Sequence, residues 1–337
     1  MAIKLLIVDD SAFMRRIIAN TVLEFDEVEV AGIARNGLDA LEIIPKLKPD
    51  IITLDIEMPK LNGIEALKII RERYNIPVIM LSSHTGTDIT IEALEIGALD
   101  FIEKPADLKS NLSEFKSELE MKIKSVFPKK DKEKALKNDR SLKENDNKIK
   151  EVKAVVIGAS TGGPKALSYL INKLPDKIKV PIFIVQHMPK GFTASFAQRL
   201  DNECPIKVVE AEDGMITESN TVYLAPGDFH MIIEGRRIRL KDNEKLHGVR
   251  PAVDYLFNSA ASVYKENLLG IIMTGMGRDG SQGMENIKKM GGYNIAQDEE
   301  SCIVYGMPGS AVSRKVVDII LSLDDISAKL NELIRVK

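Results

Sequence analysis

One serine of the chain lies in a glycine-rich turn of a kind that exposes nucleophiles. Residues 155–167 read VVIGASTGGPKAL, an apolar run followed by glycines and then by a helical pattern. Gly158–Gly162 fits G-x-S-x-G, the sharp strand-to-helix turn that presents a serine hydroxyl. The spacing fits neither the dinucleotide fingerprint nor the phosphate-binding P-loop. Such a turn also occurs as a plain loop or as an anion nest, so Ser160 is at this point a candidate nucleophile.

A nucleophilic serine needs a base and a group that orients the base. His187 follows an apolar run that predicts a buried parallel strand, whereas His230 opens an expected hairpin and His247 lies in a polar loop. Asp279 follows another apolar run, and its carboxylate is suited either to orient an imidazole or to cap the next helix. Backbone N–H groups near Met276 in the same loop are suited to an oxyanion hole. The order Ser, His, Asp differs from that of the α/β-hydrolases, but geometry defines a triad.

A second group of chemically active residues lies in the first 105 residues. Asp9 and Asp10 follow one apolar run, Asp55 closes another, and Ser82 and Lys104 follow two more. One such aspartate is commonly a cap or a turn residue, but three carboxylates at strand ends repel one another unless a cation lies among them. An all-oxygen site of this kind suits Mg²⁺, and a lysine nearby neutralises added anionic charge. The pattern predicts a site that binds or carries a phosphoryl group.

The elements that position these residues alternate strand and helix. Five short apolar runs in the first half predict strands at Lys4–Val8, Val28–Ala34, Ile51–Leu54, Val78–Leu81 and Phe101–Ile102. Helical apolar faces alternate with them, and we expect Phe13 and Leu38 on the inward faces of the first two. This alternation predicts an α/β fold with a parallel sheet and helices on both faces. The strands before Ser160, His187 and Asp279 predict a second such sheet, with all three residues at its carboxyl edge.

Composition bounds the remaining possibilities. The chain has 337 residues, a net charge of −3 and two cysteines without metal-ligand spacing, which favours two domains, reduced thiols and no nucleic-acid partner. No apolar run reaches the roughly 20 residues of a membrane span, and the N-terminus lacks a secretory pattern, so we expect a cytoplasmic protein without membrane insertion. Residues 128–150 carry nine basic and five acidic side chains, which favours a solvated linker over a basic binding patch. We therefore expect domains at 1–125 and 151–337, joined by 126–150.

The first half resembles the receiver domains of response regulators. The resemblance rests on LLIVDDSAFMRRII, DIITLDIEMPKLNGIEAL, PVIMLSS and GALDFIEKP. It implies a flavodoxin-like (βα)5 fold in which Asp55 accepts a phosphoryl group from a chemotaxis histidine kinase. It also implies that Mg²⁺ is held by Asp9, Asp10, Asp55 and the carbonyl of Glu57. Ser82 and Lys104 would contact the phosphoryl oxygens, and Phe101 would be the aromatic residue that moves with them.

The second half resembles the protein-glutamate methylesterases of chemotaxis, the CheB family. The resemblance rests on IGASTGGPKAL, VQHMPKGFTASFAQRL, VYLAPGDFHM, RPAVDYLF, IIMTGMGRDG and YGMPGSA. It implies a three-layer α/β/α domain with a mainly parallel sheet and a triad of Ser160, His187 and Asp279. The implied activity is hydrolysis of glutamate methyl esters on methyl-accepting chemoreceptors, with release of methanol, and deamidation of selected receptor glutamines. It implies no cofactor at the esterase site and activation by phosphorylation of the receiver.

Two alternative functions remain open on the sequence. Many receivers carry transcriptional output domains, but the second half shows no helix-turn-helix pattern, and steep salt-dependent binding to duplex DNA would support this alternative. The glycine turn is also suited to a nucleotide-binding module, which tight nucleotide binding by a Ser160→Ala protein would support.

Overall fold

The computed structural model describes residues 2–83, 86–105, 108–127 and 151–335. The chain divides into two compact units, Met1–Pro128 and Lys129–Lys337. The expected linker, 126–150, lies outside the described residues except for its first two positions. Within the described part of the chain, no helix combines the length and apolar character that crossing a bilayer requires.

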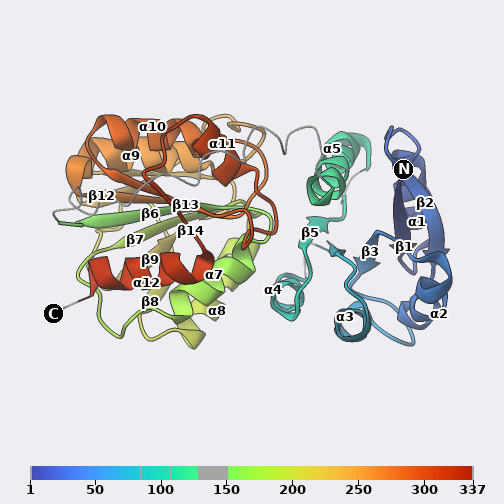
Figure 1. Cartoon of the computed structure of the whole chain (residues 1–337). Helices are drawn as coiled ribbons and strands as arrows, with labels where there is room; N and C mark the ends of the chain where they lie inside the picture. The colour runs from blue at the N-terminus through green and yellow to red at the C-terminus, as the bar shows by residue number, and fades with distance from the viewer. Residues whose placement is uncertain (1, 84–85, 106–107, 128–150, 336–337) are drawn as a thin grey trace. The chain divides into compact units, whose positions relative to one another are not determined.

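The first unit is a five-stranded parallel sheet with the strand order β2-β1-β3-β4-β5. Its strands are β1 (Ile3–Val8), β2 (Val28–Ala34), β3 (Ile51–Asp55), β4 (Val78–Ser82) and β5 (Asp100–Glu103). Its helices are α1 (Ala12–Val22), α2 (Gly37–Leu47), α3 (Gly63–Arg73), α4 (Thr87–Ile96) and α5 (Leu108–Val126). Helices α1 and α5 cover one face of the sheet, and α2, α3 and α4 cover the other (Figure 1). The predicted doubly wound parallel sheet is confirmed.

Short polar side chains begin three of these helices, and the sheet then selects which faces are buried. Ser11 and Asn36 each accept a backbone N–H of the first turn, and Asn62 forms a capping box with Glu65. The expectation that Phe13 and Leu38 point inward is wrong, because they are 58% and 47% exposed. The buried row of α1 begins one residue later, at Met14, and one residue turns a helix by roughly 100°. The apolar stripe is therefore wider than the strip that the sheet covers.

The second unit is a seven-stranded parallel sheet in the order β14-β13-β12-β6-β7-β9-β8, with a separate antiparallel hairpin β10-β11. Its strands are β6 (Ala154–Ala159), β7 (Ile182–Gln186), β8 (Lys207–Glu210), β9 (Thr221–Leu224), β10 (His230–Glu234), β11 (Arg237–Lys241), β12 (Leu268–Ile272), β13 (Tyr293–Gln297) and β14 (Ile319–Leu321). Its described helices are α7 (Gly163–Asn172), α8 (Phe192–Glu203), α9 (Val253–Tyr264), α10 (Ser281–Lys289), α11 (Met307–Ser313) and α12 (Leu323–Ile334), and Lys265–Asn267 forms a 3₁₀ turn.

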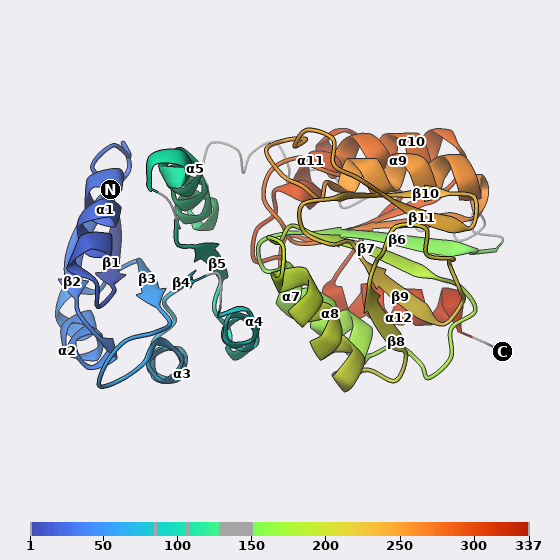
Figure 2. The same cartoon turned by 180° about the vertical axis from the view of Figure 1, so that it is seen from behind.

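Helices cover both faces of this second sheet. Helices α9, α10 and α11 lie on one face, and α7, α8 and α12 lie on the other, which makes three layers (Figures 1 and 2). The hairpin β10-β11 packs beside α9. The predicted α/β/α domain is confirmed. Its expected hairpin at His230 turns at Gly235, which has a φ of +61°.

The first strand of the second unit lies at the centre of its sheet. Strand β6 pairs with β12 on one side and with β7 on the other. The chain continues from β6 to β7 on one side and returns later to β12 on the other side. This reversal of strand order creates a topological switch point at the carboxyl ends of these three strands. Parallel sheets bind ligands at such points, because the loops there diverge and leave a crevice. Ser160, His187 and Asp279 all follow these strands.

Candidate active site

The turn that carries Ser160 is fixed by backbone hydrogen bonds. The Ser160 N–H donates to the carbonyl of Thr274 (3.0 Å), and the Gly163 N–H donates to the carbonyl of Ser160 (2.7 Å). Gly162 has a φ of +75°, in the left-handed region that favours glycine, and α7 begins at the next residue. A Cβ on Gly275 would lie 2.9 Å from the Cβ of Ser160, so only glycine lets the two loops approach this closely. The predicted strand-turn-helix is present.

Gln186, the last residue of β7, holds the backbone on both sides of the switch point. Its side-chain amide donates to the carbonyls of Ser160 (3.0 Å) and His187 (3.2 Å). A Cβ on Gly163 would lie 2.0 Å from the Gln186 side-chain oxygen, so the first residue of α7 leaves room for this amide. Gln186 is 2% exposed. Sequence reasoning missed this residue, although a polar side chain ending an apolar strand is a recognisable signal.

His187 and Asp279 are brought together at the edge of the sheet. The His187 N–H donates to the carbonyl of Ala159 (3.2 Å), which places the histidine beside the end of β6. Its ring atom Nε2 lies 2.8 Å from Oδ2 of Asp279. The other ring nitrogen, Nδ1, is thereby left as the proton-accepting atom of the neutral imidazole. Among the described residues the Ser160 hydroxyl makes no hydrogen bond, so the structure joins His187 to Asp279 but does not join Ser160 to His187.

Asp279 is held as a carboxylate at the start of a helix from another part of the chain. It accepts the backbone N–H groups of Val253 (2.6 Å) and Asp254 (3.0 Å) in the first turn of α9, and that of Gly280 (2.9 Å). Burial pushes the pKa of Asp279 upward, but the bond and charge of His187 and the two α9 N–H groups lower it below its ordinary value. The alternative expectation is that Asp279 caps the helix that follows it. The N-cap of that helix, α10, is Gly280, and the Asp279 carboxylate instead bonds the first turn of α9.

Thr274 links the serine turn to two other loops. Its hydroxyl donates to the carbonyl of Thr161 (3.0 Å) and accepts the N–H groups of Ile303 (3.1 Å) and Val304 (3.0 Å). The loop that contains Met276 follows directly, and the Gly275 carbonyl accepts two N–H groups from the start of α11. The Met276 backbone, the expected oxyanion donor, is therefore in a loop that is bonded to the Ser160 turn.

Replacing Thr274 with valine keeps its shape and removes these bonds. Since three backbone groups lose a partner, two of them on the buried residues Thr161 and Val304, we expect a loss of roughly 2–4 kcal/mol in the free energy of unfolding. Denaturant unfolding of the full chain measures this loss. Thr221→Val is the matched control, because its hydroxyl is also on a buried residue but makes only one long bond, of 3.5 Å. Equal stability of the two variants would contradict the prediction.

The second predicted group, in the first unit, is assembled around a lysine. Lys104 Nζ lies 2.9 Å from Oδ2 of Asp9 and 2.7 Å from Oδ2 of Asp55. A carboxylate oxygen from each of Asp9, Asp10 and Asp55 lies within 4.8 Å of the others. A cavity of about 250 Å³ opens beside them and is lined by Asp10, Asp55, Ile56, Glu57, Ser82, Ser83, Gly86 and Lys104. The oxygen-only donor set fits Mg²⁺, which prefers carboxylates and water.

Burial and the charges of neighbouring groups act in opposite directions on the pKa values of this cluster. Burial raises the pKa of Asp55 to about 6, although the bond and charge of Lys104 act in the opposite direction. Burial alone would lower the pKa of Lys104, but Asp55 and Asp9 raise it above its ordinary value. A buried carboxylate with one cation among three acids is poised to accept further cationic charge.

Ser82 lines the cavity beside this cluster, whereas Phe101 on β5 is not among the residues that line it. The Ser82 hydroxyl is buried and bonds Thr90 Oγ1 of α4 (2.6 Å) and the carbonyl of Ser83 (3.1 Å). Phe101 is 4% exposed, and the Lys122 ammonium lies 5.4 Å from the centre of its ring. The structure thus brings Asp9, Asp10, Asp55 and Lys104 together, while the Ser82 hydroxyl is engaged by α4.

Comparisons with known proteins agree with this geometry. The model described as "CheB methylesterase" matches residues 155–330, and that of the "Response regulator receiver domain" matches residues 5–115. A protein-glutamate methylesterase/protein-glutamine glutaminase of Pyrococcus horikoshii is 46% identical, with 99% of this chain and 95% of the relative covered. One from Thermotoga maritima is 43% identical, with 98% of each chain covered.

A solved structure extends the comparison to the fold of the second unit. The crystal structure of the Thermotoga maritima CheB methylesterase catalytic domain is 44% identical and has a TM-score of 0.52, covering 54% of this chain and 99% of that domain. The two alternatives, a nucleotide-binding module and a transcriptional output, gain no support from these comparisons. The match of the family model to more than half of the chain, and the whole-chain identity to its relatives, place this protein in the CheB methylesterase family.

Proposed function

We propose that this protein hydrolyses the γ-methyl esters of glutamate side chains on chemoreceptors and deamidates selected receptor glutamines, under the control of its receiver domain. Membership in the family and the names of its relatives support this activity. One observation supports the assignment of this activity to particular residues. It is the 2.8 Å hydrogen bond between His187 and Asp279, beside the turn of Ser160. The reaction class is acyl transfer through a serine nucleophile.

In the proposed mechanism Ser160 Oγ attacks the ester carbonyl and its proton passes to Nδ1 of His187. Nδ1 is the atom used, because Nε2–H donates to Asp279. The protonated ring then delivers this proton to the departing methoxide, and methanol leaves. Water attacks the resulting acyl-serine with the same base, which releases glutamate and restores Ser160. For a glutamine the leaving group is ammonia, and the tetrahedral intermediate is of the same kind.

The oxyanion of that intermediate needs preorganised N–H donors. We assign the backbone N–H of Met276 to this role, supported by the tight approach of Gly275 to Ser160. No cofactor is assigned to this site.

In the first unit we assign Asp55 as the phosphoryl acceptor, with Lys104 and Ser82 as contacts of the phosphoryl oxygens. Asp9, Asp10, Asp55 and the carbonyl of Glu57 would hold Mg²⁺, which neutralises charge at the acceptor. The phosphodonor is a chemotaxis histidine kinase, and the substrate receptors are met in the cytoplasm.

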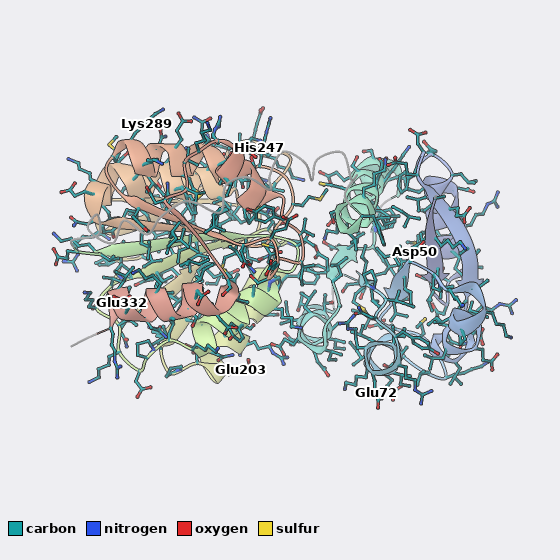
Figure 3. The ribbon with its side chains drawn as sticks, viewed as in Figure 1. Asp50, Glu72, Glu203, His247, Lys289 and Glu332 are labelled. Carbon is teal, nitrogen blue, oxygen red and sulfur yellow. The ribbon has the colours of Figure 1, made fainter. Side chains whose placement is uncertain are left out.

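Asp55→Asn is expected to abolish phosphorylation, because the amide is not a nucleophile toward phosphorus. Labelled phosphate on the full chain, supplied by a small phosphodonor with Mg²⁺, measures this. Asp50→Asn is the control, because that residue is also an aspartate of the first unit but lies on its surface (Figure 3). Label retained by the Asp55→Asn protein would point to another acceptor.

A fragment of residues 148–337 is expected to release methanol faster than the unphosphorylated full chain. This expectation follows from the proposal that the receiver restrains the hydrolase to which it is joined. Phosphorylation shifts that equilibrium only as far as its preference for the open state allows. Interfaces between domains are usually modest, so opening costs a few kcal/mol. Methanol release from methylated receptor membranes is compared for the full chain, the full chain with phosphodonor and Mg²⁺, and the fragment. A fragment no faster than the resting full chain would mean that the receiver acts by recruiting substrate.

A further inference from the structure

A second histidine–carboxylate pair lies behind the first. Asp254, in the first turn of α9, is 2% exposed, and its Oδ2 atom lies 3.2 Å from Nε2 of His247. It also accepts the N–H of Gly283 (2.7 Å) in the first turn of α10. Asp254 thus caps α10, while Asp279, beside α10, caps α9. This mutual arrangement places two buried carboxylates at two helix N-termini, where negative charge is stabilised.

The carboxylates of Asp254 and Asp279 are close enough to interact electrostatically. One oxygen of each, together with a ring nitrogen of His247, lies within 4.8 Å of the others. Since His187 bonds Asp279, the four side chains form the series His187, Asp279, Asp254, His247. Burial and then the charge of Asp279 raise the pKa of Asp254, although Gly283 and His247 act in the opposite direction. The pKa of Asp279, by contrast, is lowered.

His247 is presented to this pair by an uncommon backbone. Leu246 and Val249 exchange two backbone bonds around a two-residue turn, in which His247 has a φ of +56° and Gly248 a φ of +80°. Such turns need a positive φ at both central positions, which glycine, asparagine and aspartate adopt most readily and which histidine also tolerates. Its side chain is 26% exposed and lies at the surface of the second unit (Figure 3).

We propose that Asp254, paired with His247, is a positioning residue that acts through Asp279 to set the pH range in which His187 is an available base. The inference rests on the proposed function, in which His187 takes the proton of Ser160. A negative charge on Asp254 adds to that of Asp279 and favours the protonated His187 ring. A proton taken up by His247 offsets this charge.

The elements packed around the series carry other ionisable groups. They are His230 on β10, Glu244, Lys245 and Arg250 in the loop before α9, Arg278 beside Asp279 in the sequence, and Glu285 on α10. His230 is fully buried and has both ring nitrogens bonded, to Ala252 N–H and the Glu244 carbonyl. Burial lowers its pKa, which keeps this ring neutral. Glu285 pairs with Lys289 and Arg314. Arginine and lysine keep a constant charge in the tested range, so Asp254 and His247 are the groups to vary.

Asp254→Asn removes the charge and retains an oxygen for the Gly283 N–H. We expect the acidic limb of the kcat/KM profile for methanol release to move to lower pH by about 0.5–1 unit, because one negative charge that favours the protonated ring is lost from a partly hydrated site. The plateau at higher pH is expected to change much less. The control is Asp324→Asn, which removes an exposed carboxylate of α12 and is expected to leave the limb unmoved. A uniform loss of activity with an unmoved limb would overturn the inference.

A second measurement needs no substrate and no change at Asp254. In the full chain, an NMR pH titration of the His187 ring, assigned with His187→Gln, is expected to show its main inflection and a smaller one from His247. His247→Gln, which retains a donor for Asp254, is expected to remove only the smaller inflection. A single inflection that is identical in both proteins would contradict the inference. Unaltered protein that releases no methanol would instead contradict the proposed function.

Discussion

Ser160→Ala is expected to lower methanol release by about 10⁴-fold or more, since removal of the nucleophile of a serine hydrolase leaves only binding and oxyanion stabilisation. The fold is expected to persist, because the turn is held by the backbone N–H and carbonyl of residue 160, which alanine retains. The measurement is methanol released from methylated receptor membranes by the phosphorylated full chain.

The matched control for this variant is Ser168→Ala. Ser168 lies in α7, is 9% exposed and has a hydroxyl without a hydrogen-bond partner, so its loss removes no chemistry. Unchanged activity in Ser168→Ala and near-total loss in Ser160→Ala would separate the nucleophile from general damage to α7. Methanol release by Ser160→Ala near the unaltered rate would exclude a serine nucleophile.

Asp279→Asn is expected to reduce turnover by up to about 10⁴-fold. The amide NH₂ would face Nε2 of His187 and favour the tautomer with the proton on Nδ1, which leaves no base toward Ser160. The variant also exchanges a carboxylate for an amide at the N-terminus of α9. His187→Ala is expected to be nearly as damaging, because it removes the base itself. Both are measured as methanol release under saturating phosphodonor.

Asp201→Asn is the control for this change. Asp201 also accepts a backbone N–H, that of Val208 at 2.7 Å, but it lies outside the switch point. If Asp201→Asn and Asp279→Asn lost activity equally, stability rather than chemistry would explain the effect, and the assigned role of Asp279 would be wrong.

Strand ends and chemistry-bearing residues were predictable because parallel strands bring their carboxyl ends to one edge. Asp9, Asp55 and Lys104 follow apolar runs in the sequence and meet in space for that reason. His187 and Asp279 are 92 residues apart and bonded for the same reason. Periodicity alone did not identify which side of each apolar stripe meets the sheet, as the exposed Phe13 shows.

The supporting contacts could not be predicted, because they join segments that no local pattern relates. Asp254 reads as an ordinary acid at the start of a helix, and only the packing of α9 against α10 places it beside Asp279. The engagement of the Ser82 hydroxyl by Thr90 depends in the same way on where α4 packs. Such residues belong to one element and contact a second one, and the local sequence indicates only the first.

The central place of β6 has a consequence for how the enzyme comes into being. This strand is synthesised first in its unit, yet its neighbour β12 begins with Leu268, which pairs with Ala154 across 114 residues of chain. Contacts of such high sequence separation form slowly, and until they form one edge of β6 is an unpaired apolar template. A nascent or truncated chain that ends before β12 carries Ser160 and His187 but lacks Asp279, the group that orients the His187 ring. On the proposed function, such a chain is expected to release no methanol until β12 and the loop after it have been added to the sheet.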